Sequence, residues 1–249
     1  MLVKWLIFLK DNPMITILRY QFLSFLAVIA GFCSVPSASA HPNDRVAHWV
    51  EQVILGPEFG GVGKICSRWV KTPRLSIFGA SEQQQKVVTD VITHLNETLT
   101  KTPIKKIELL KATDVGADIQ VYFAPLQDFP SLAKQHKFQY VQDNWGYFWT
   151  FWNGRHEIES AFVLLASDKL QGKALQHFAL EEITQSLGLS NDSPVFPESI
   201  FYAKGNNGGD VQQFSNLDKQ LIVFFYNHIQ PGATRGEVQA AFKKHWGVQ

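Results

Sequence analysis

The fold is decided by residues 181–192, which read EEITQSLGLSND. We predict that a helix over residues 172–187 ends here, because Gly188 can adopt the backbone conformation that terminates helices. Glu181 and Gln185 are four residues apart, so they would lie one above the other on one face of that helix. The stretch therefore predicts two polar side chains on one ridge, followed by a sharp turn.

The elements predicted around this helix give a mixed α+β chain. Ser81, Ser215 and Thr234 are predicted to begin helices, and the last two are followed three residues later by Asp218 and Glu237, the capping-box spacing. The other predicted elements are helices over residues 46–54, 81–99, 215–229 and 234–246 and strands over residues 74–78, 104–110, 117–123, 147–152 and 158–165. Strands and helices are segregated after the first strand–helix unit, which indicates an α+β sandwich.

The first 40 residues have the pattern of an export signal. Lys4, Lys10 and Arg19 supply positive charge, residues 22–32 are apolar, and residues 38–40 read Ala-Ser-Ala, the small residues that a signal peptidase needs. We predict a signal peptide over residues 1–40, a single domain over residues 41–249, and a periplasmic or secreted location. An uncleaved N-terminal membrane anchor is the alternative, although the apolar run is shorter than the ~20 residues that span a bilayer.

The chain after the predicted signal is close to neutral. The signal contains three basic residues and Asp11, which leaves 20 basic and 21 acidic residues. A basic footprint for nucleic acid is absent, so no nucleic-acid partner is predicted. Cys66 is the only cysteine left, which excludes an internal disulfide and predicts a small buried side chain.

Residues 181–202 resemble the metal-binding helix and the following turn of metzincin zinc peptidases. Those enzymes read H-E-x-x-H-x-x-G-x-x-H before a methionine-containing turn. Aligning on Gly188 places Glu182 on the catalytic glutamate. The resemblance implies a zincin-like fold, in which a mixed, mostly antiparallel sheet packs against a central active-site-like helix and C-terminal helices.

The turn after the helix continues the resemblance with changed residues. Ser199, Phe201 and Tyr202 match a Ser-Ile-Met-x-Tyr turn that is one residue shorter and has phenylalanine for methionine. Together with the run that ends at Asp192 and with Arg68 and the tryptophan after it, they also resemble a family of exported bacterial proteins of unknown function. That membership would assign the changed motif to the whole family, and it implies no activity or partner.

The same alignment puts Glu181, Gln185 and Asn191 on the three histidine positions. Zinc prefers thiolate and imidazole ligands, whereas these residues offer one carboxylate and two amides. Such donors suit calcium or magnesium better, but calcium takes about six to eight oxygens, and Glu182 and Asp192 are the only other acids here. We predict no metal and no other cofactor, with zinc or calcium as the alternatives.

A hydrogen-bonded network is the favoured interpretation of the ridge. His177, Glu181 and Gln185 are spaced by four residues, so both His177 and Gln185 are expected to pair with the Glu181 carboxylate. A metal site formed by His177, Glu181 and His156 is the alternative.

Residues 145–152 form an unusual aromatic run, WGYFWTFW. In a strand, Tyr147, Trp149 and Phe151 share one face, and Phe148 and Trp152 share the other. Because both faces are aromatic, we predict a central or heavily covered strand. A peptide or glycan groove is the alternative.

Three functions remain open from the sequence. The favoured one is a non-catalytic exported protein that binds a peptide, a protein or an envelope component through the cleft that the resemblance implies. The second is a hydrolase, a peptidase with or without a metal, in which Glu182 is the general base. The third is a structural component of the cell envelope. No individual partner is indicated.

Overall fold

The computed structural model describes residues 42–55, 65–111, 114–204, 207–208 and 210–247, so the predicted signal over residues 1–40 lies outside the described residues. The helices are α1 (Pro42–Ile54), α2 (Glu82–Leu99), α3 (Phe129–His136, after a short 3₁₀ helix over Leu126–Asp128), α4 (Gly172–Gln185), α5 (Asn216–His228) and α6 (Arg235–His245). The strands are β1 (Arg74–Phe78), β2 (Glu108–Leu110), β3 (Ile119–Ala124), β4 (Gly146–Trp152), β5 (Ile158–Ala166), β6 (Ala203–Lys204) and β7 (Asn207–Gly208).

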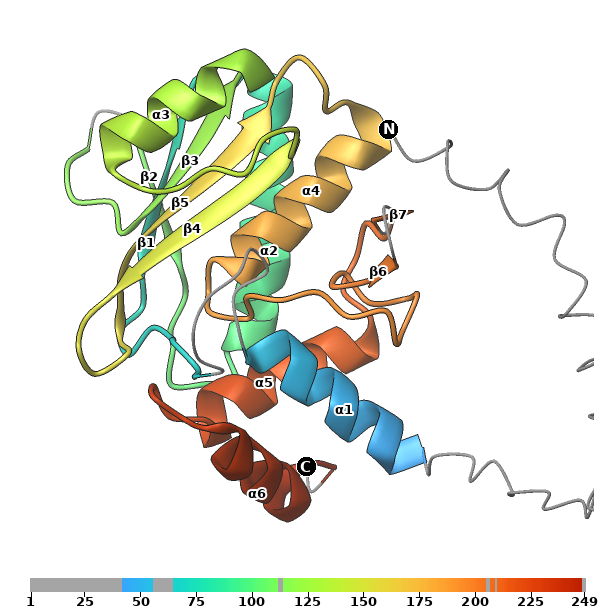
Figure 1. Cartoon of the computed structure of the whole chain (residues 1–249). Helices are drawn as coiled ribbons and strands as arrows, with labels where there is room; N and C mark the ends of the chain where they lie inside the picture. The colour runs from blue at the N-terminus through green and yellow to red at the C-terminus, as the bar shows by residue number, and fades with distance from the viewer. Residues whose placement is uncertain (1–41, 56–64, 112–113, 205–206, 209, 248–249) are drawn as a thin grey trace, which may run out of the picture. The chain divides into compact units, whose positions relative to one another are not determined.

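Five strands form the main sheet in the order β2-β1-β3-β5-β4 (Figure 1). β1 pairs in parallel with β2 and β3, β3 pairs in parallel with β5, and β4 pairs antiparallel with β5. The sheet is therefore mostly parallel, and the prediction of a mostly antiparallel sheet was wrong. The cause lies in the connections: α2 carries the chain back between β1 and β2, whereas the turn between β4 and β5 reverses it.

Helices cover both faces of the sheet. α2 and α4 lie on one face and α3 on the other (Figure 1). On the α3 side, the ring of His136 contacts the rings of Tyr122 and Phe162. Val121 and Val163 are the alternating neighbours of those two residues, so they point to the opposite face, where they are fully buried. This alternation defines the core between the sheet and α4.

β4 lies at the edge of the sheet, so the prediction of a central strand was wrong. Its first half is buried, with Tyr147 at 0% and Phe148 at 7% exposure, whereas Trp152 at its end is 49% exposed. The alternative wording of that prediction, a heavily covered strand, holds for this buried half alone. The aromatic run could not show that the outer edge of the strand lacks a neighbour in the described part of the chain.

Three of the predicted helix starts are confirmed, whereas the helix predicted to start at residue 46 begins at Pro42. Ser81, Ser215 and Thr234 each stand directly before the first residue of a helix. By contrast, β2 begins at Glu108, later than predicted, because the backbone amide of Ile107 binds a side chain of α2 instead of a neighbouring strand. No described helix is long and apolar enough to cross a membrane.

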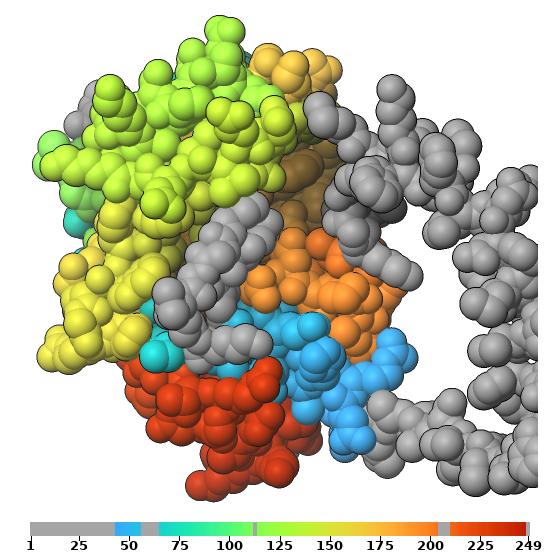
Figure 2. Space-filling model, in the orientation of Figure 1, coloured from blue at the N-terminus to red at the C-terminus, as the bar shows by residue number. Residues whose placement is uncertain are grey.

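α1 contacts both the turn after α4 and the helix α6. Figure 2 shows α1 (blue) between the residues that follow α4 (orange) and the C-terminal helices (red). Arg45 donates to the carbonyl of Val195 at 3.2 Å, and Glu51 forms an ion pair with Arg235 of α6. The first described helix thus forms part of the support for the end of α4.

Candidate functional site

The C-terminal end of α4 is fixed by the segment that precedes β1. The indole Nε1 of Trp69 donates to the carbonyl of Ser186 at 3.0 Å. The Nη1 of Arg68 donates to the carbonyls of Phe225 at 3.3 Å and Tyr226 at 2.8 Å, and its guanidinium lies 5.4 Å from the centre of the Tyr226 ring. Buried Arg68 and Trp69 therefore hold the ends of α4 and α5 together, which sets the direction of α4.

Gly188 terminates the helical segment as predicted. Its φ of +109° lies in the region that disfavours residues with a Cβ. A Cβ at this position would overlap the carbonyl oxygen of Ser67 and would lie 3.2 Å from the Cα of Arg68. The glycine is therefore required both by backbone conformation and by close contact with the segment before β1.

The polar ridge of α4 is buried. His177 is 2% exposed, Glu181 7% and Gln185 1%. The Nδ1 of His177 lies 2.7 Å from the carbonyl of Val211, so Nδ1 carries the proton that it donates. The Nε2 faces the Oε2 of Glu181 at 3.2 Å without the alignment of a hydrogen bond, so this contact is an ion pair when the imidazole is protonated. The predicted pairing of His177 with Glu181 is confirmed.

The pKa of His177 is raised by its partners. Burial alone lowers this pKa, but the Glu181 carboxylate, the Val211 carbonyl and the charge of Asp210 more than offset burial. A raised folded-state pKa means that His177 adds stability that is fully present below the unfolded value of about 6.5. This stability is lost as the pH rises through the folded-state pKa.

We expect His177→Gln to lower the free energy of unfolding more at about pH 6 than at about pH 8.5. The measurement is denaturant unfolding of both proteins at the two pH values. His48→Gln is the control, since His48 is exposed on α1 and its loss should have the same small effect at both pH values. An equal loss for His177→Gln at both pH values would contradict the assignment of the charged pair.

The other two ligand positions bind different partners. The Nε2 of Gln185 donates to the Oδ1 of Asp192 at 2.8 Å, so the prediction that Gln185 pairs with Glu181 was wrong. The reason is that the turn after Gly188 returns Asp192 to the ridge. The Nδ2 of Asn191 donates to the carbonyl of Gln52 at 3.1 Å.

The side chain of Glu182 extends from α4 toward the edge strand β4. Glu182 is buried, with an exposed fraction of 5%. A Cβ on Gly146, the first residue of β4, would lie 2.5 Å from the Oε1 of Glu182 and 2.5 Å from the Cδ1 of Phe178. The carboxylate of Glu182 therefore lies directly against the backbone where β4 begins. Gly146, the one glycine within the aromatic run, was the overlooked sequence signal.

The turn at residues 199–202 is anchored to the start of α5. The hydroxyl of Ser199 donates to the Oδ1 of Asp218 at 2.6 Å and accepts from the backbone amide of Phe201 at 3.1 Å. Phe201 is fully buried, and the backbone amide of Tyr202 donates to the carbonyl of Ser199 at 3.2 Å. The turn thus fixes Phe201 inside the core beside the site.

The sequence did not reveal that α1 packs against the residues that follow α4. The Oε1 of Gln52 accepts from the hydroxyl of Ser193 at 2.6 Å, next to the contact of its carbonyl with Asn191. The ring of Trp49 meets Phe196 edge-on at 5.7 Å. The sequence shows only an amphipathic pattern over residues 46–54. This pattern predicts that one face of the helix is buried, but it does not identify the residues that cover this face.

Comparison with known families adds one result. Residues 44–244 match the family described as "Protein of unknown function (DUF2927)". The chain belongs to the DUF2927 family. No curated protein matches the sequence. Two solved structures of myroilysin are similar to this DUF2927 chain at 11% and 12% identity, with TM-scores of 0.40 and 0.41. They cover 64% and 75% of this chain, and the matches span 95% and 96% of the myroilysin chains.

The donors of this DUF2927 domain do not fit a catalytic zinc. The described residues contain no group of three or more His, Cys, Asp or Glu side chains placed to share one ion. His156 lies in the turn between β4 and β5, beside Gly232, so the alternative metal site with His177 and Glu181 is wrong. Among the described residues, none donates a hydrogen bond to the buried Oε1 of Gln185, so the site keeps an acceptor for a water molecule or a ligand.

Cys66 is not a nucleophile in this site. It is fully buried, and burial raises the pKa of its thiol to about 12, although the positive charge of Arg68 acts to lower this pKa. A thiol that stays protonated at neutral pH is a poor nucleophile. The prediction of a small buried residue is confirmed.

Proposed function

We propose that this DUF2927 protein is an exported, zinc-free and metzincin-like domain that binds an extended polypeptide along β4 without cleaving it. The observation that carries the proposal is a contrast within one site. The ligand-position side chains already have partners within the protein: Glu181 pairs with His177 on α4 itself, and Gln185 and Asn191 bind residues outside α4. On the facing strand, the outer edge of β4 pairs with no strand in the described chain.

The register of the hairpin identifies the backbone groups at this edge. The amide of Ala166 donates to the carbonyl of Trp145 at 2.8 Å, so these two residues form a hydrogen-bonded pair. In an antiparallel ladder such pairs alternate with pairs that do not hydrogen-bond to each other. The backbone N–H and C=O groups of Gly146, Phe148 and Thr150 therefore point away from β5. An incoming extended segment can pair with them as an added strand.

The composition of β4 supports a functional edge. Proteins usually protect an exposed edge strand with charges or proline, and the partly exposed half of β4, residues 149–152, has neither. Trp145, just before the strand, is 44% exposed, and Trp152 at its end is 49% exposed. Two exposed indole rings at the two ends of an unprotected strand favour an extended, apolar polypeptide as the partner.

Two variants of Thr150 separate strand addition from side-chain recognition. Peptides selected on the full-length protein from a random displayed library serve as probes. Thr150→Pro removes one outward N–H and is expected to weaken binding about tenfold or more, whereas Thr150→Ala keeps the N–H and should bind nearly as well as the natural protein. Equal affinity of both variants would show that the peptides bind elsewhere.

The hydrolase is the second candidate, because Glu182 occupies the position of the general base and lies against the start of β4. Its test is a peptidase assay with and without a chelator, beside Glu182→Gln. We expect no turnover in any sample and no stoichiometric zinc after dialysis. Turnover that the chelator or Glu182→Gln abolishes would replace the binding proposal with catalysis.

Export is part of the proposal and is tested separately. N-terminal sequencing of the protein recovered from the periplasm or the medium of a bacterial host should begin at His41. A chain that keeps its first residues and stays with the membrane would favour the anchor instead.

A further inference from the structure

Two histidines face each other where α5 and α6 meet, away from the proposed binding edge of β4. His228 is the last residue of α5, and His245 is the last residue of α6. Their rings are stacked, with centroids 4.1 Å apart and an angle of 4° between the planes. Both residues are partly buried, and the ring of Phe224 lies 5.7 Å from that of His228.

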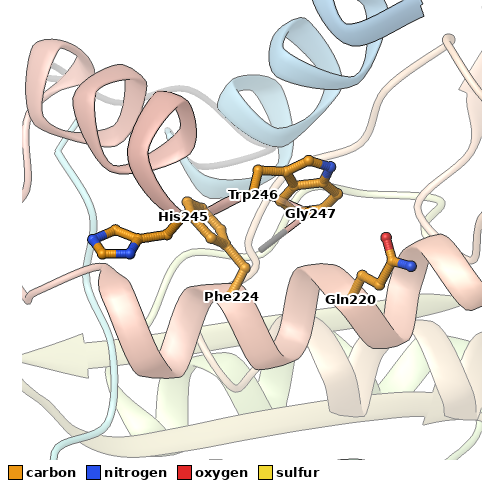
Figure 3. A pocket seen from close by; sticks show the side chains of 5 residues that line it. All are labelled: Gln220, Phe224, His245, Trp246 and Gly247. Atoms are coloured by element: carbon orange, nitrogen blue, oxygen red, sulfur yellow. The ribbon is translucent and has the colours of Figure 1, made fainter. Parts of the chain in front are cut away.

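Aromatic contacts hold the last turn of α6 on α5. The ring of Trp246 lies 5.3 Å from Phe224 and 5.1 Å from Phe242. Figure 3 shows Phe224 and Gln220 rising from α5 toward His245 and Trp246, around a hollow of about 140 Å³. Within α6, Val238 is the one residue that is fully buried. The last turn of this helix is therefore held by ring contacts of partly buried residues, and the histidine stack is one of them.

The charges that act on His228 are basic, although Asp44 and Glu51 line a hollow on the other side of Trp246. Burial lowers the pKa of His228, and the neighbouring charges of His245 and Lys244 lower it further. Glu237 lines the hollow beside His228, but its carboxylate accepts hydrogen bonds from the backbone and the hydroxyl of Thr234. Lys219 of α5 lines a different hollow next to Val223, together with Lys101 and Glu97.

We propose that the stack of His228 on His245 is a pH-sensitive clasp. When both rings are neutral, they hold the last turn of α6 on α5. When acidification protonates His228, its charge lies face to face with His245 and near Lys244, the two groups whose charges oppose it, and this turn separates from α5. The separation exposes the aromatic surface of Phe224 and Trp246.

The direction of the pH effect follows from the lowered folded-state pKa. A lowered pKa means that the stack adds stability that is present above the unfolded histidine value of about 6.5. This stability is lost as the pH falls through the folded-state pKa of His228. The ion pair of His177 has the opposite dependence, so the two effects can be told apart in one protein.

Hydrogen exchange of the full-length protein tests the clasp. Amide protection in residues 242–246 is measured at about pH 7.5 and about pH 5, after correction for intrinsic exchange rates. We expect it to fall about tenfold at the lower pH, while the central amides of α2 keep theirs. His245→Phe keeps a ring on His228 without a second titrating group, and it should remove most of this drop. Lys244→Gln should give a smaller drop than the natural protein.

The controls keep the test decisive. His228→Phe is the second variant if His245→Phe does not fold at the higher pH, as judged by its circular dichroism. The proposal is overturned if protection in residues 242–246 is the same at both pH values in the natural protein. A full tenfold drop that persists in the folded phenylalanine variant would overturn it as well.

Discussion

Gly188→Ala is expected to lower the free energy of unfolding by about 3 kcal/mol. Two costs contribute to this loss. The φ of +109° costs about 1–2 kcal/mol for a residue with a Cβ. The Cβ would also overlap the carbonyl of Ser67, and forcing atoms into a packed region costs about 1–3 kcal/mol. Denaturant unfolding with a constant m-value measures the difference.

Two other glycines serve as matched controls. Gly172 has a φ of +51° and open space around its missing Cβ, so Gly172→Ala should cost only the backbone strain, about 1 kcal/mol. Gly154 has neither feature, and Gly154→Ala should change the stability by less than about 0.5 kcal/mol. Equal losses at Gly188 and Gly172 would show that the contact with Ser67 contributes nothing.

Local features were predictable from the sequence because they depend on residues close in the chain. A hydroxyl before a helix and a glycine after one act within a single turn, so Ser215 and Gly188 could be assigned. The ion pair of His177 and Glu181 was predictable for the same reason, since residues four apart share one helix face.

Features that depend on the path of the chain were not predictable. The pairing of Gln185 with Asp192 requires the turn after α4 to bring Asp192 back, and the spacing alone favoured Glu181. The parallel order of the sheet depends on crossovers, which an alternating strand pattern does not encode. The contact of Gln52 with Asn191 joins residues 139 positions apart, and no pattern in either segment predicts that the two segments meet.

Asp218→Ala is expected to be as damaging as the change at Gly188, with a loss of about 3 kcal/mol. The carboxylate is fully buried. It accepts hydrogen bonds from the hydroxyls of Ser199 at 2.6 Å and Ser215 at 2.8 Å, and from the backbone amides of Ile200 and Ser215. Burial raises the pKa of Asp218, although the hydrogen bonds from these donors act to lower it. Alanine would leave several buried donors without an acceptor, and each such donor costs about 1–3 kcal/mol.

A double-mutant cycle with Ser199→Ala tests whether this network joins the turn to α5. If the Asp218 carboxylate holds the turn through Ser199, the double variant should lose less than the two single losses added together, by about 1 kcal/mol. Glu237→Ala is the control, because Glu237 caps α6 with the same geometry but is exposed, and its loss should be clearly smaller. Additive losses in the cycle would mean that Asp218 does not hold the turn through Ser199. The amide of Ile200 would then be its only bond to the turn among the described residues.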